Sequence, residues 1–191
     1  QLQLMQSGHL SPFPPARRPA LAETGNTRWQ WRALAEHDLV WLPKLYASTR
    51  EQELQAVRWP AQAKQQFLAQ QFAAQHQHYL AHYPGAHYLA LEQEGEVLGR
   101  FYIDESGKND LLVDISLFPA WRGKGVGSEL IQRQQQASAS RGRSLSLHVM
   151  MHNVAAQRLY ARLGFVVTAE SADGLYLPMN WQPTAGASIN G

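Results

Sequence analysis

The sequence predicts an α/β fold in which one mixed β-sheet is flanked by helices. Segments with the period of amphipathic helices alternate with short apolar runs typical of strands. Their order along the chain is strand, two helices, three strands, helix, strand, helix and two strands. A chain of 191 residues that is 45% hydrophobic and 17% charged can bury a substantial core. This order of elements favours an α/β sandwich with a mixed sheet.

Both ends of the chain differ in composition from its middle. The start is rich in Pro, Gln and small residues, and its run SPFPPARRPALAETGN suits neither a helix interior nor a central strand. The final run, QPTAGASING, has the same character. We therefore expect a disordered leader over 1–26, one folded domain over 27–181 and a flexible tail over 182–191.

The first half of the expected domain holds two helices and four strands. A strand over 27–34 would place Trp29, Trp31 and Ala33 on one side. A long helix starts at Trp59-Pro60 and runs to about His82, where a Pro-Gly pair ends it. The other elements are a helix over 38–48 and strands over 86–93, 96–104 and 110–118.

The second half begins with a glycine-rich turn after Pro119, which opens a helix to about Arg141. An apolar strand follows over 144–151. A helix over 153–163 then stops at Gly164, a residue well suited to the position after a helix. The last two strands are expected over 165–170 and 174–179.

Composition excludes several functional classes. The chain has no cysteine, so disulfides, thiolate metal sites and cysteine nucleophiles are excluded. The net charge is only +2, and the sequence lacks the dense basic stripe that is typical of nucleic-acid-binding proteins. No nucleic-acid partner is therefore expected. No apolar stretch approaches the roughly 20 residues that span a bilayer. We therefore expect no membrane partner and a cytoplasmic location.

A metal site is not expected either. His78 and His82 have the i, i+4 spacing that can bind a metal on a helix. Their surroundings, rich in Ala and Gln, hold neither an H-E-x-x-H pattern nor a carboxylate pair. An ordinary solvated helix is the favoured interpretation.

The run Arg122–Gly127 carries the chemistry of anion binding. The first N–H groups of a helix have no partner within it, and the helix dipole makes that end positive. Glycines at 123, 125 and 127 remove side chains that would hold a phosphate away, while Arg122 and Lys124 add positive charge. The run matches neither the P-loop nor the dinucleotide fingerprint. Taken alone, the turn is equally compatible with a tight strand-to-helix connection that binds nothing.

A second informative segment, HNVAAQRLYARLGF, follows about 30 residues later. Asn153 can cap the helix that it opens. Apolar residues recur with helical period on one face of this helix, and Gly164 ends it. The apolar positions are Ala155, Ala156, Leu159, Tyr160 and Leu163.

Together these two segments resemble the GNAT family of N-acetyltransferases. Arg122-x-x-Gly125-x-Gly127 after a strand resembles the acetyl-CoA signature of that family, and the run from Asn153 to Phe165 resembles its second motif. The resemblance covers about 110–167. It implies a mostly antiparallel sheet in which two neighbouring parallel strands splay apart to form an acetyl-CoA cleft. It further implies transfer of the acetyl group from acetyl-CoA to a primary amine, by direct attack in a ternary complex.

The resemblance also implies roles for individual residues. Backbone groups of Leu117 would contact the pantetheine arm and the acetyl carbonyl, and Asn153, with Ala156 in the same motif, would bind that arm. Tyr160 would donate a proton to the departing CoA thiolate; the alternative is a core tyrosine on an amphipathic helix. The backbone amides expected to hold the pyrophosphate belong to Arg122, Gly123, Lys124, Gly125, Val126, Gly127 and Ser128.

An amine acceptor must lose a proton before it attacks a thioester, so a base is also sought. Asp114 is the first candidate, because a charge in the apolar strand LLVDISLF is costly unless it is paired or useful. His148 in the neighbouring strand is the second. Either can equally be a satisfied structural polar group, and some members of the family have no dedicated base.

The acceptor is expected to be an amine on a small molecule or a peptide. By resemblance, the long helix with Trp59 and Tyr83 would line its entrance. Dimers are common in the family, so a homodimer is an open possibility that no residue pattern here identifies. The alternative function is a non-catalytic acyl-CoA-binding sensor of the same fold.

Overall fold

The computed structural model describes residues 10–25 and 28–184, which form two compact units. The first unit contains 10–15 and 34–84. The second contains 16–33 and 85–184, and it holds the sheet and both sequence motifs. The expected boundaries of a single domain over 27–181 stay a prediction.

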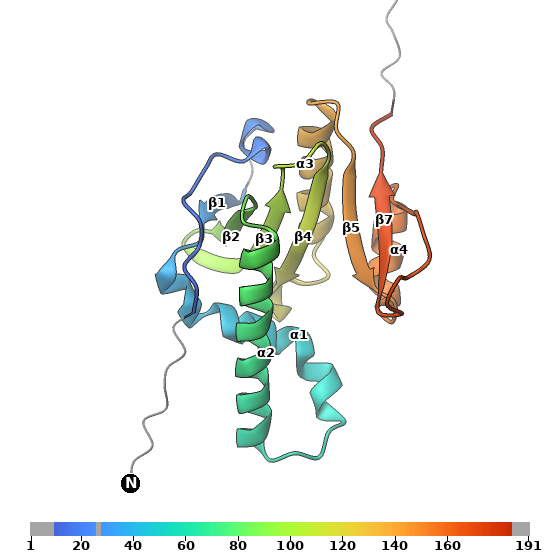
Figure 1. Cartoon of the computed structure of the whole chain (residues 1–191). Helices are drawn as coiled ribbons and strands as arrows, with labels where there is room; N and C mark the ends of the chain where they lie inside the picture. Colours follow the sequence, from blue (N-terminus) through green and yellow to red (C-terminus); the bar gives the residue numbers. More distant parts are fainter. Residues whose placement is uncertain (1–9, 26–27, 185–191) are drawn as a thin grey trace, which may run out of the picture. The chain divides into compact units, whose positions relative to one another are not determined.

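Helices make up the first unit (Figure 1). The helix expected over 38–48 is instead a 3-10 turn, η2 (Glu36–Val40), followed by α1 (Leu42–Gln55). Asp38 explains the break, because its buried carboxylate accepts hydrogen bonds from the Ala35 N–H and the Trp41 indole, both at 2.8 Å. Helix α2 (Ala61–His82) follows Pro60, close to the expected start.

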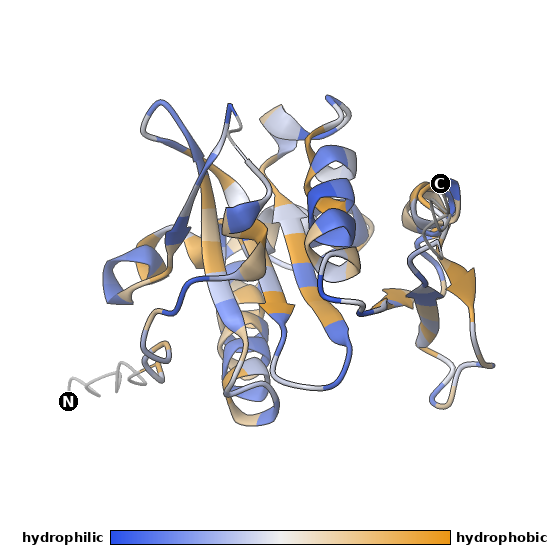
Figure 2. Ribbon diagram, turned by 90° about the horizontal axis from the view of Figure 1, so that it is seen from above, coloured by the Kyte–Doolittle hydropathy of each residue, from blue (hydrophilic) through white to orange (hydrophobic). Residues whose placement is uncertain are grey.

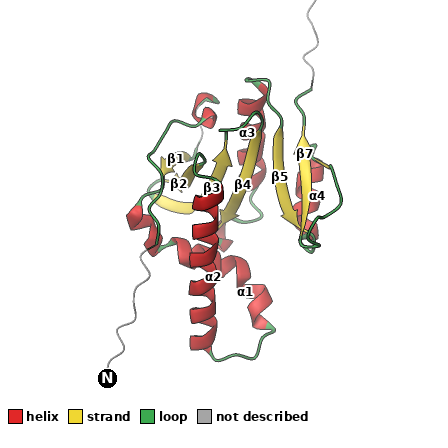
Figure 3. Cartoon of the chain, in the orientation of Figure 1, coloured by secondary structure: helices red, strands yellow, loops and turns green. Residues whose placement is uncertain are grey.

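The strands of the described part of the chain form one seven-stranded sheet in the order β1-β2-β3-β4-β5-β7-β6 (Figure 3). Every neighbouring pair is antiparallel except β4 and β5. This confirms the predicted mixed, mostly antiparallel sheet and the predicted order of elements. The strands are β1 (Gln30–Ala33), β2 (His87–Gln93), β3 (Glu96–Asp104), β4 (Asp110–Leu117), β5 (Leu145–Met150), β6 (Val166–Val167) and β7 (Tyr176–Trp181).

The parallel strands β4 and β5 part along their length, as predicted. They pair only from Asp110↔Leu145 to Leu112↔Leu147. Beyond that point β5 stays paired with β7 as far as Met150, while β4 stays paired with β3 as far as Leu117. The carboxyl ends of β4 and β5 are therefore not hydrogen-bonded to each other.

The main core of the second unit lies on one face of the sheet, against α3 (Val126–Ala139) and α4 (Val154–Arg162). Along β5 buried positions alternate with less buried ones, as expected where one face of a strand meets a core. Figure 2 shows hydrophobic and hydrophilic residues following one another along the ribbons of the sheet. Core side chains from the strands include Phe101, Ile103, Leu112, Leu145, Leu147, Val149 and Met179. Ile131 of α3 and Tyr160 of α4 pack onto them.

Residues 10–25 of the expected leader contact both units, while the disorder expected over 1–26 stays a prediction. In the second unit, Leu21 is 1% exposed and belongs to the main core, within the 3-10 helix η1 (Ala20–Glu23). The Ala20 N–H donates to Glu105 at 3.0 Å. In the first unit, the Ser11 carbonyl lies 2.8 Å from Nε2 of His76. One buried leucine and these hydrogen bonds therefore anchor parts of this proline-rich segment.

The remaining predictions for the ends concern residues outside the described part. Residues 1–9 of the leader, residue 26 and residues 185–191 of the tail lie there. Within the tail, Gln182 donates a hydrogen bond to the Asn180 side chain at 2.9 Å. The flexibility expected over 182–191 stays a prediction.

Candidate active site

The glycine-rich run opens α3 in the expected place. A short 3-10 turn, η3 (Pro119–Trp121), follows β4, and α3 begins at Val126 with Gly125 as its N-cap. Gly123 and Gly125 have φ angles of 70° and 79°, a left-handed conformation that favours glycine. A Cβ built on either glycine would meet no atom within 4 Å. These two glycines therefore allow the turn and leave open space beside it.

The amides at this helix start have a geometry that could bind an anion. The first intrahelical hydrogen bond runs from the Glu129 N–H to the Gly125 carbonyl at 3.1 Å. Helix geometry leaves the earlier N–H groups of Val126, Gly127 and Ser128 without a carbonyl in the helix. Three amides, the positive end of the helix dipole and the open space beside Gly125 fit a diphosphate group.

Two cationic side chains flank the amides. Nε of Arg122 donates to the Leu117 carbonyl at 2.9 Å, which ties the end of β4 to the loop. The Lys124 ammonium lies 5.2 Å from the ring centre of Trp121. The Leu117 carbonyl, expected to face a pantetheine arm, thus already accepts one hydrogen bond, and a carbonyl oxygen can accept a second.

Asn153 caps α4, as the sequence predicts. Its side-chain oxygen accepts a hydrogen bond from the Ala156 N–H at 3.1 Å. Ala156 itself packs against the main core. The cap leaves the side-chain amide of Asn153 able to donate to a ligand, since an asparagine amide carries two donors.

Tyr160 lies on α4 among core residues, with its ring 5.8 Å from that of Phe165. Burial, and then the negative charge of Asp114, raise the pKa of Tyr160 to about 12. Within residues 10–25 and 28–184, the phenol forms no hydrogen bond. The side chain therefore keeps its proton at neutral pH, and its hydroxyl can donate to a ligand.

Asp114 is held by two neighbours. Arg100 donates to both of its carboxylate oxygens, at 3.3 and 3.0 Å, and the Ser116 hydroxyl donates at 2.7 Å. Side-chain exposure is 3% for Arg100 and 11% for Asp114, so the ion pair is largely buried. Such a pair is sensitive to loss of either partner.

A bulge in β4 changes which side chains share a face. Tyr102 is opposite Asp114 and Ile103 is opposite Leu112, so Val113 is the extra residue. Simple alternation would have put Leu112 and Asp114 on one face, opposite Ile115. In the structure Leu112 and Ile115 both join the core, because the bulge shifts the alternation by one residue.

His148 is exposed, and it lies on β5 opposite Pro178. Its neighbours Leu147 and Val149 are buried in the main core. Strand alternation therefore directs His148 away from that core. Asp114, paired with Arg100 rather than with core residues, lies on the same non-core side of the sheet.

The paired histidines of α2 lie close together. Their rings are stacked at 4.0 Å, and Nδ1 of His82 lies 2.9 Å from the His78 carbonyl oxygen. Across the residues that the structure describes, no three His, Cys, Asp or Glu side chains are grouped so that they could hold a metal ion.

Sequence reasoning missed the partners of Asp114. Arg100 is a charge within the apolar run EVLGRFYID, which is the same signal that singled out Asp114. Pairing the two lone charges of adjacent strands would have identified the ion pair. Ser116 carries no comparable signal.

The splayed strands and the glycine-lined helix start define an acyl-CoA-binding class of fold, and comparison identifies the family. Residues 47–165 match the model of the acetyltransferase (GNAT) family. This match covers more than half of the chain, so the chain belongs to the GNAT family. Members of this family use acetyl-CoA as co-substrate.

Curated relatives match over part of their length. The N-acetyltransferase YycN of Bacillus subtilis is 33% identical over 91 residues, which cover 44% of this chain and 58% of the relative. The 5-NmdU N-acetyltransferase of Pseudomonas phage PaMx11 is 35% identical over 94 residues, covering 47% and 66% respectively. The chain thus spans less than two thirds of each of these relatives.

Solved structures share the fold at low sequence identity. The PaiA N-acetyltransferase of Thermoplasma acidophilum, in complex with coenzyme A, has a TM-score of 0.62 at 14% identity, over 81% of this chain and 99% of that chain. Ard1 of Thermoplasma volcanium has a TM-score of 0.56 at 16% identity, over 83% and 100% respectively. No helix among the described residues is long and apolar enough to cross a membrane.

Proposed function

We propose that this protein transfers the acetyl group of acetyl-CoA to a primary amine by direct attack in a ternary complex. One observation carries the proposal: the open amides at the start of α3 follow the end of β4, where β4 has parted from β5. Acetyl-CoA would supply an activated thioester. The protein would supply a place to hold it, a proton donor and a surface for the amine.

The cofactor-binding residues have separate tasks in this proposal. Amides over 122–128 would hold the pyrophosphate, with Arg122 and Lys124 adding positive charge. Backbone groups of Leu117, the Asn153 side-chain amide and the α4 start near Ala156 would contact the pantetheine arm. The open space beside Gly123 and Gly125 supports this placement.

Tyr160 is proposed as the general acid. As the bond between the acetyl carbon and sulfur breaks, the phenol would donate its proton to the sulfur, which leaves as a thiol. The phenol keeps its proton at neutral pH and has no hydrogen-bond partner within the described residues, so the proton is available to a ligand. A purely structural tyrosine at this position would not need its hydroxyl.

The two candidate bases differ in availability. Both carboxylate oxygens of Asp114 accept hydrogen bonds from Arg100. The exposed ring of His148 has room for a water or an amine. We therefore favour His148 as the group that takes the proton of the amine, with Asp114 as the alternative.

The acceptor is proposed to be an amine on a small molecule or a peptide. The relatives do not favour one acceptor, because the phage enzyme named for 5-NmdU and the uncharacterised YycN match this chain about equally well. A cytoplasmic location and a homodimer stay predictions.

A screen of acetyl transfer across amine classes tests the proposal. CoA thiol release would be measured with acetyl-CoA and polyamines, amino acids, aminoglycosides and peptide N-termini, on the full chain and on Tyr160→Phe. At least one amine class should support turnover that the variant loses. Acetyl-CoA that stabilises the fold without turnover of any amine would contradict the proposal and favour a sensor.

A further inference from the structure

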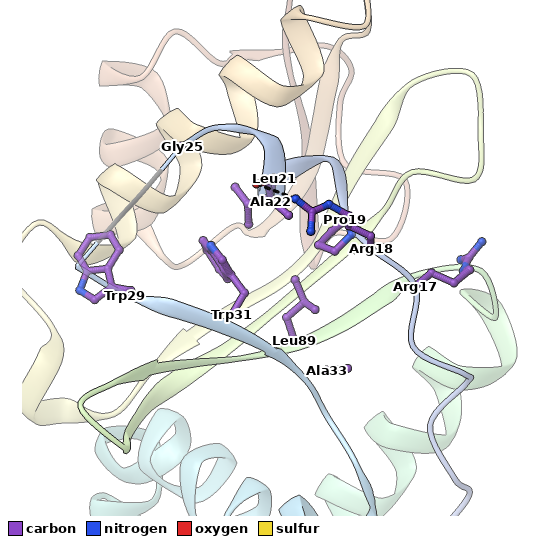
Figure 4. Close-up of a pocket in the computed structure, with 10 residues that line it drawn as sticks. All are labelled: Arg17, Arg18, Pro19, Leu21, Ala22, Gly25, Trp29, Trp31, Ala33 and Leu89. Atoms are coloured by element: carbon purple, nitrogen blue, oxygen red, sulfur yellow. Dashed lines mark hydrogen bonds between the residues drawn. The ribbon is translucent and has the colours of Figure 1, made fainter.

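One cavity is lined by residues outside the glycine-rich loop. It has a volume of about 340 Å³ and lies between leader residues 17–25 and strand β1 (Figure 4). Its lining includes Arg17, Arg18, Leu21, Trp29, Trp31 and Leu89. This volume is at the lower end of the range for small-molecule sites.

The apolar walls of the cavity are held in place by the core. Leu21, Trp29 and Leu89 are 1%, 3% and 4% exposed. The Trp31 ring packs against Phe101, with ring centres 5.6 Å apart. These walls are therefore formed before any ligand arrives, which reduces the entropy cost of binding.

Hydrogen-bond donors are available beside these walls. The indole N–H of Trp31 has no partner among the described residues, and Figure 4 shows the nitrogen directed toward the leader. Arg18 uses Nε for Glu23 at 2.8 Å and Nη2 for the Ala22 carbonyl at 3.5 Å. The Nη1 group of Arg18 forms no hydrogen bond with any of the described residues.

The charge of the lining determines which ligand it favours. Among the described residues, the lining contains two arginines and no acidic side chain. Glu23 pairs with Arg18 from outside the lining, and the two side chains are 70% and 72% exposed, so this ion pair is weak. A ligand carboxylate can share Arg18 or replace Glu23 on it.

We propose that this cavity binds a small aromatic carboxylate. The ring would lie against Trp31, and the carboxylate would accept hydrogen bonds from Arg18 and from the Trp31 indole. The proposal concerns a site separate from the one assigned to acetyl transfer and does not depend on that activity.

Calorimetric titration of the full chain with phenylacetate tests the proposal. Saturating CoA would be present, so that the probe cannot occupy a CoA cleft. Phenylacetate should bind saturably, and neutral phenylacetamide should bind at least about tenfold more weakly, because the charge-assisted hydrogen bonds are lost. No saturable binding, or equal affinity for both probes, would overturn the proposal.

Three variants locate the binding. Arg18→Gln and Trp31→Phe should each weaken phenylacetate binding by about tenfold, since each removes one donor. Lys108→Gln is the matched control, because Lys108 is an exposed cation in the turn between β3 and β4. Thermal unfolding would confirm that the variants fold. Unchanged affinity in both cavity variants, or equal loss in the control, would refute the site.

Discussion

The carboxylate of Asp114 on β4 acts electrostatically on the phenol of Tyr160 on α4. Burial is the larger cause of the raised pKa of Tyr160, and the charge of Asp114 adds to it, giving a value of about 12. Arg100 and Ser116 in turn hold the Asp114 carboxylate in place through hydrogen bonds.

Replacing Asp114 with Asn should lower the pKa of Tyr160. The lost negative charge no longer disfavours the phenolate, and the charge of Arg100, which Asp114 no longer neutralises, would favour it further. The value should stay above the ordinary 10.0, because burial remains. Phenolate absorbance would be titrated in Asp114→Asn, with and without Tyr160→Phe, to isolate this group. Asp104→Asn, at the end of β3, is the control and should leave the value unchanged.

Replacing Tyr160 with Phe should reduce kcat by about 100-fold, the usual range for loss of a general acid. CoA affinity should be nearly unchanged, because the ring still packs against the core. Steady-state kinetics and CoA titration would separate the two effects. A full rate in the variant would remove Tyr160 from the mechanism.

The pH profile of the wild type gives a separate test of the same group. Since the raised pKa keeps the phenol protonated below about pH 12, its ionisation should not limit the rate at moderately alkaline pH. Any alkaline decline that appears earlier should persist in the residual activity of Tyr160→Phe. A decline confined to the wild type would mean that Tyr160 ionises at a lower pH when the substrates are bound.

Replacing Gly125 with Ala should weaken CoA binding by at least about tenfold, because its Cβ enters the space assigned to the pyrophosphate. Gly142→Ala is a matched control at the other end of α3. Gly142 also has a positive φ, of 67°, and open space around its Cβ position. Both variants should lose about 1 kcal/mol of folding stability through backbone strain. Equal CoA affinity in the two variants would show that the anion site lies elsewhere.

Replacing Asp110 with Ala should destabilise the second unit by about 3 kcal/mol. The fully buried carboxylate accepts hydrogen bonds from Ser138 at 2.6 Å and from Arg143 at 3.1 Å, and it also pairs with Arg141. Urea unfolding would measure the loss. The exposed Asp173 is the comparison, and its replacement by Ala should cost much less.

Protonation of Glu105 should lower the folding stability of the protein at acidic pH. Burial alone would raise the pKa of the Glu105 carboxyl. Three interactions outweigh burial and lower this pKa below 4.5: the hydrogen bond from His87, the hydrogen bond from the Ala20 N–H, and the positive charge of Arg141. The group therefore stabilises the fold above pH 4.5, and this contribution is lost as the pH falls through the lowered value. The stability difference between wild type and Glu105→Gln should shrink over that range. A difference independent of pH would contradict the prediction.

Local features of the sequence were sufficient to predict the order of elements and the start of α3. Glycines at 123 and 125 are required by a left-handed turn, and Asn153 caps the next helix with its own side chain. Each of these interactions joins residues only a few positions apart. Apolar periodicity likewise depends on neighbours in sequence, so the strand and helix positions were largely correct.

Tertiary structure decided the features that join distant residues. The bulge at Val113 reverses the faces of β4, and the Arg100–Asp114 ion pair joins adjacent strands. Leu21 is buried in the core, and it lines the cavity beside Trp31, because it meets residues that are distant in sequence. Leu89, nearly 70 positions away, belongs to the same core and the same cavity. Amino-acid composition and hydrophobic periodicity indicate only the local preference for a helix, a strand or a loop. The energy gained when remote side chains meet is absent from any single window of the sequence, so these features required the folded chain.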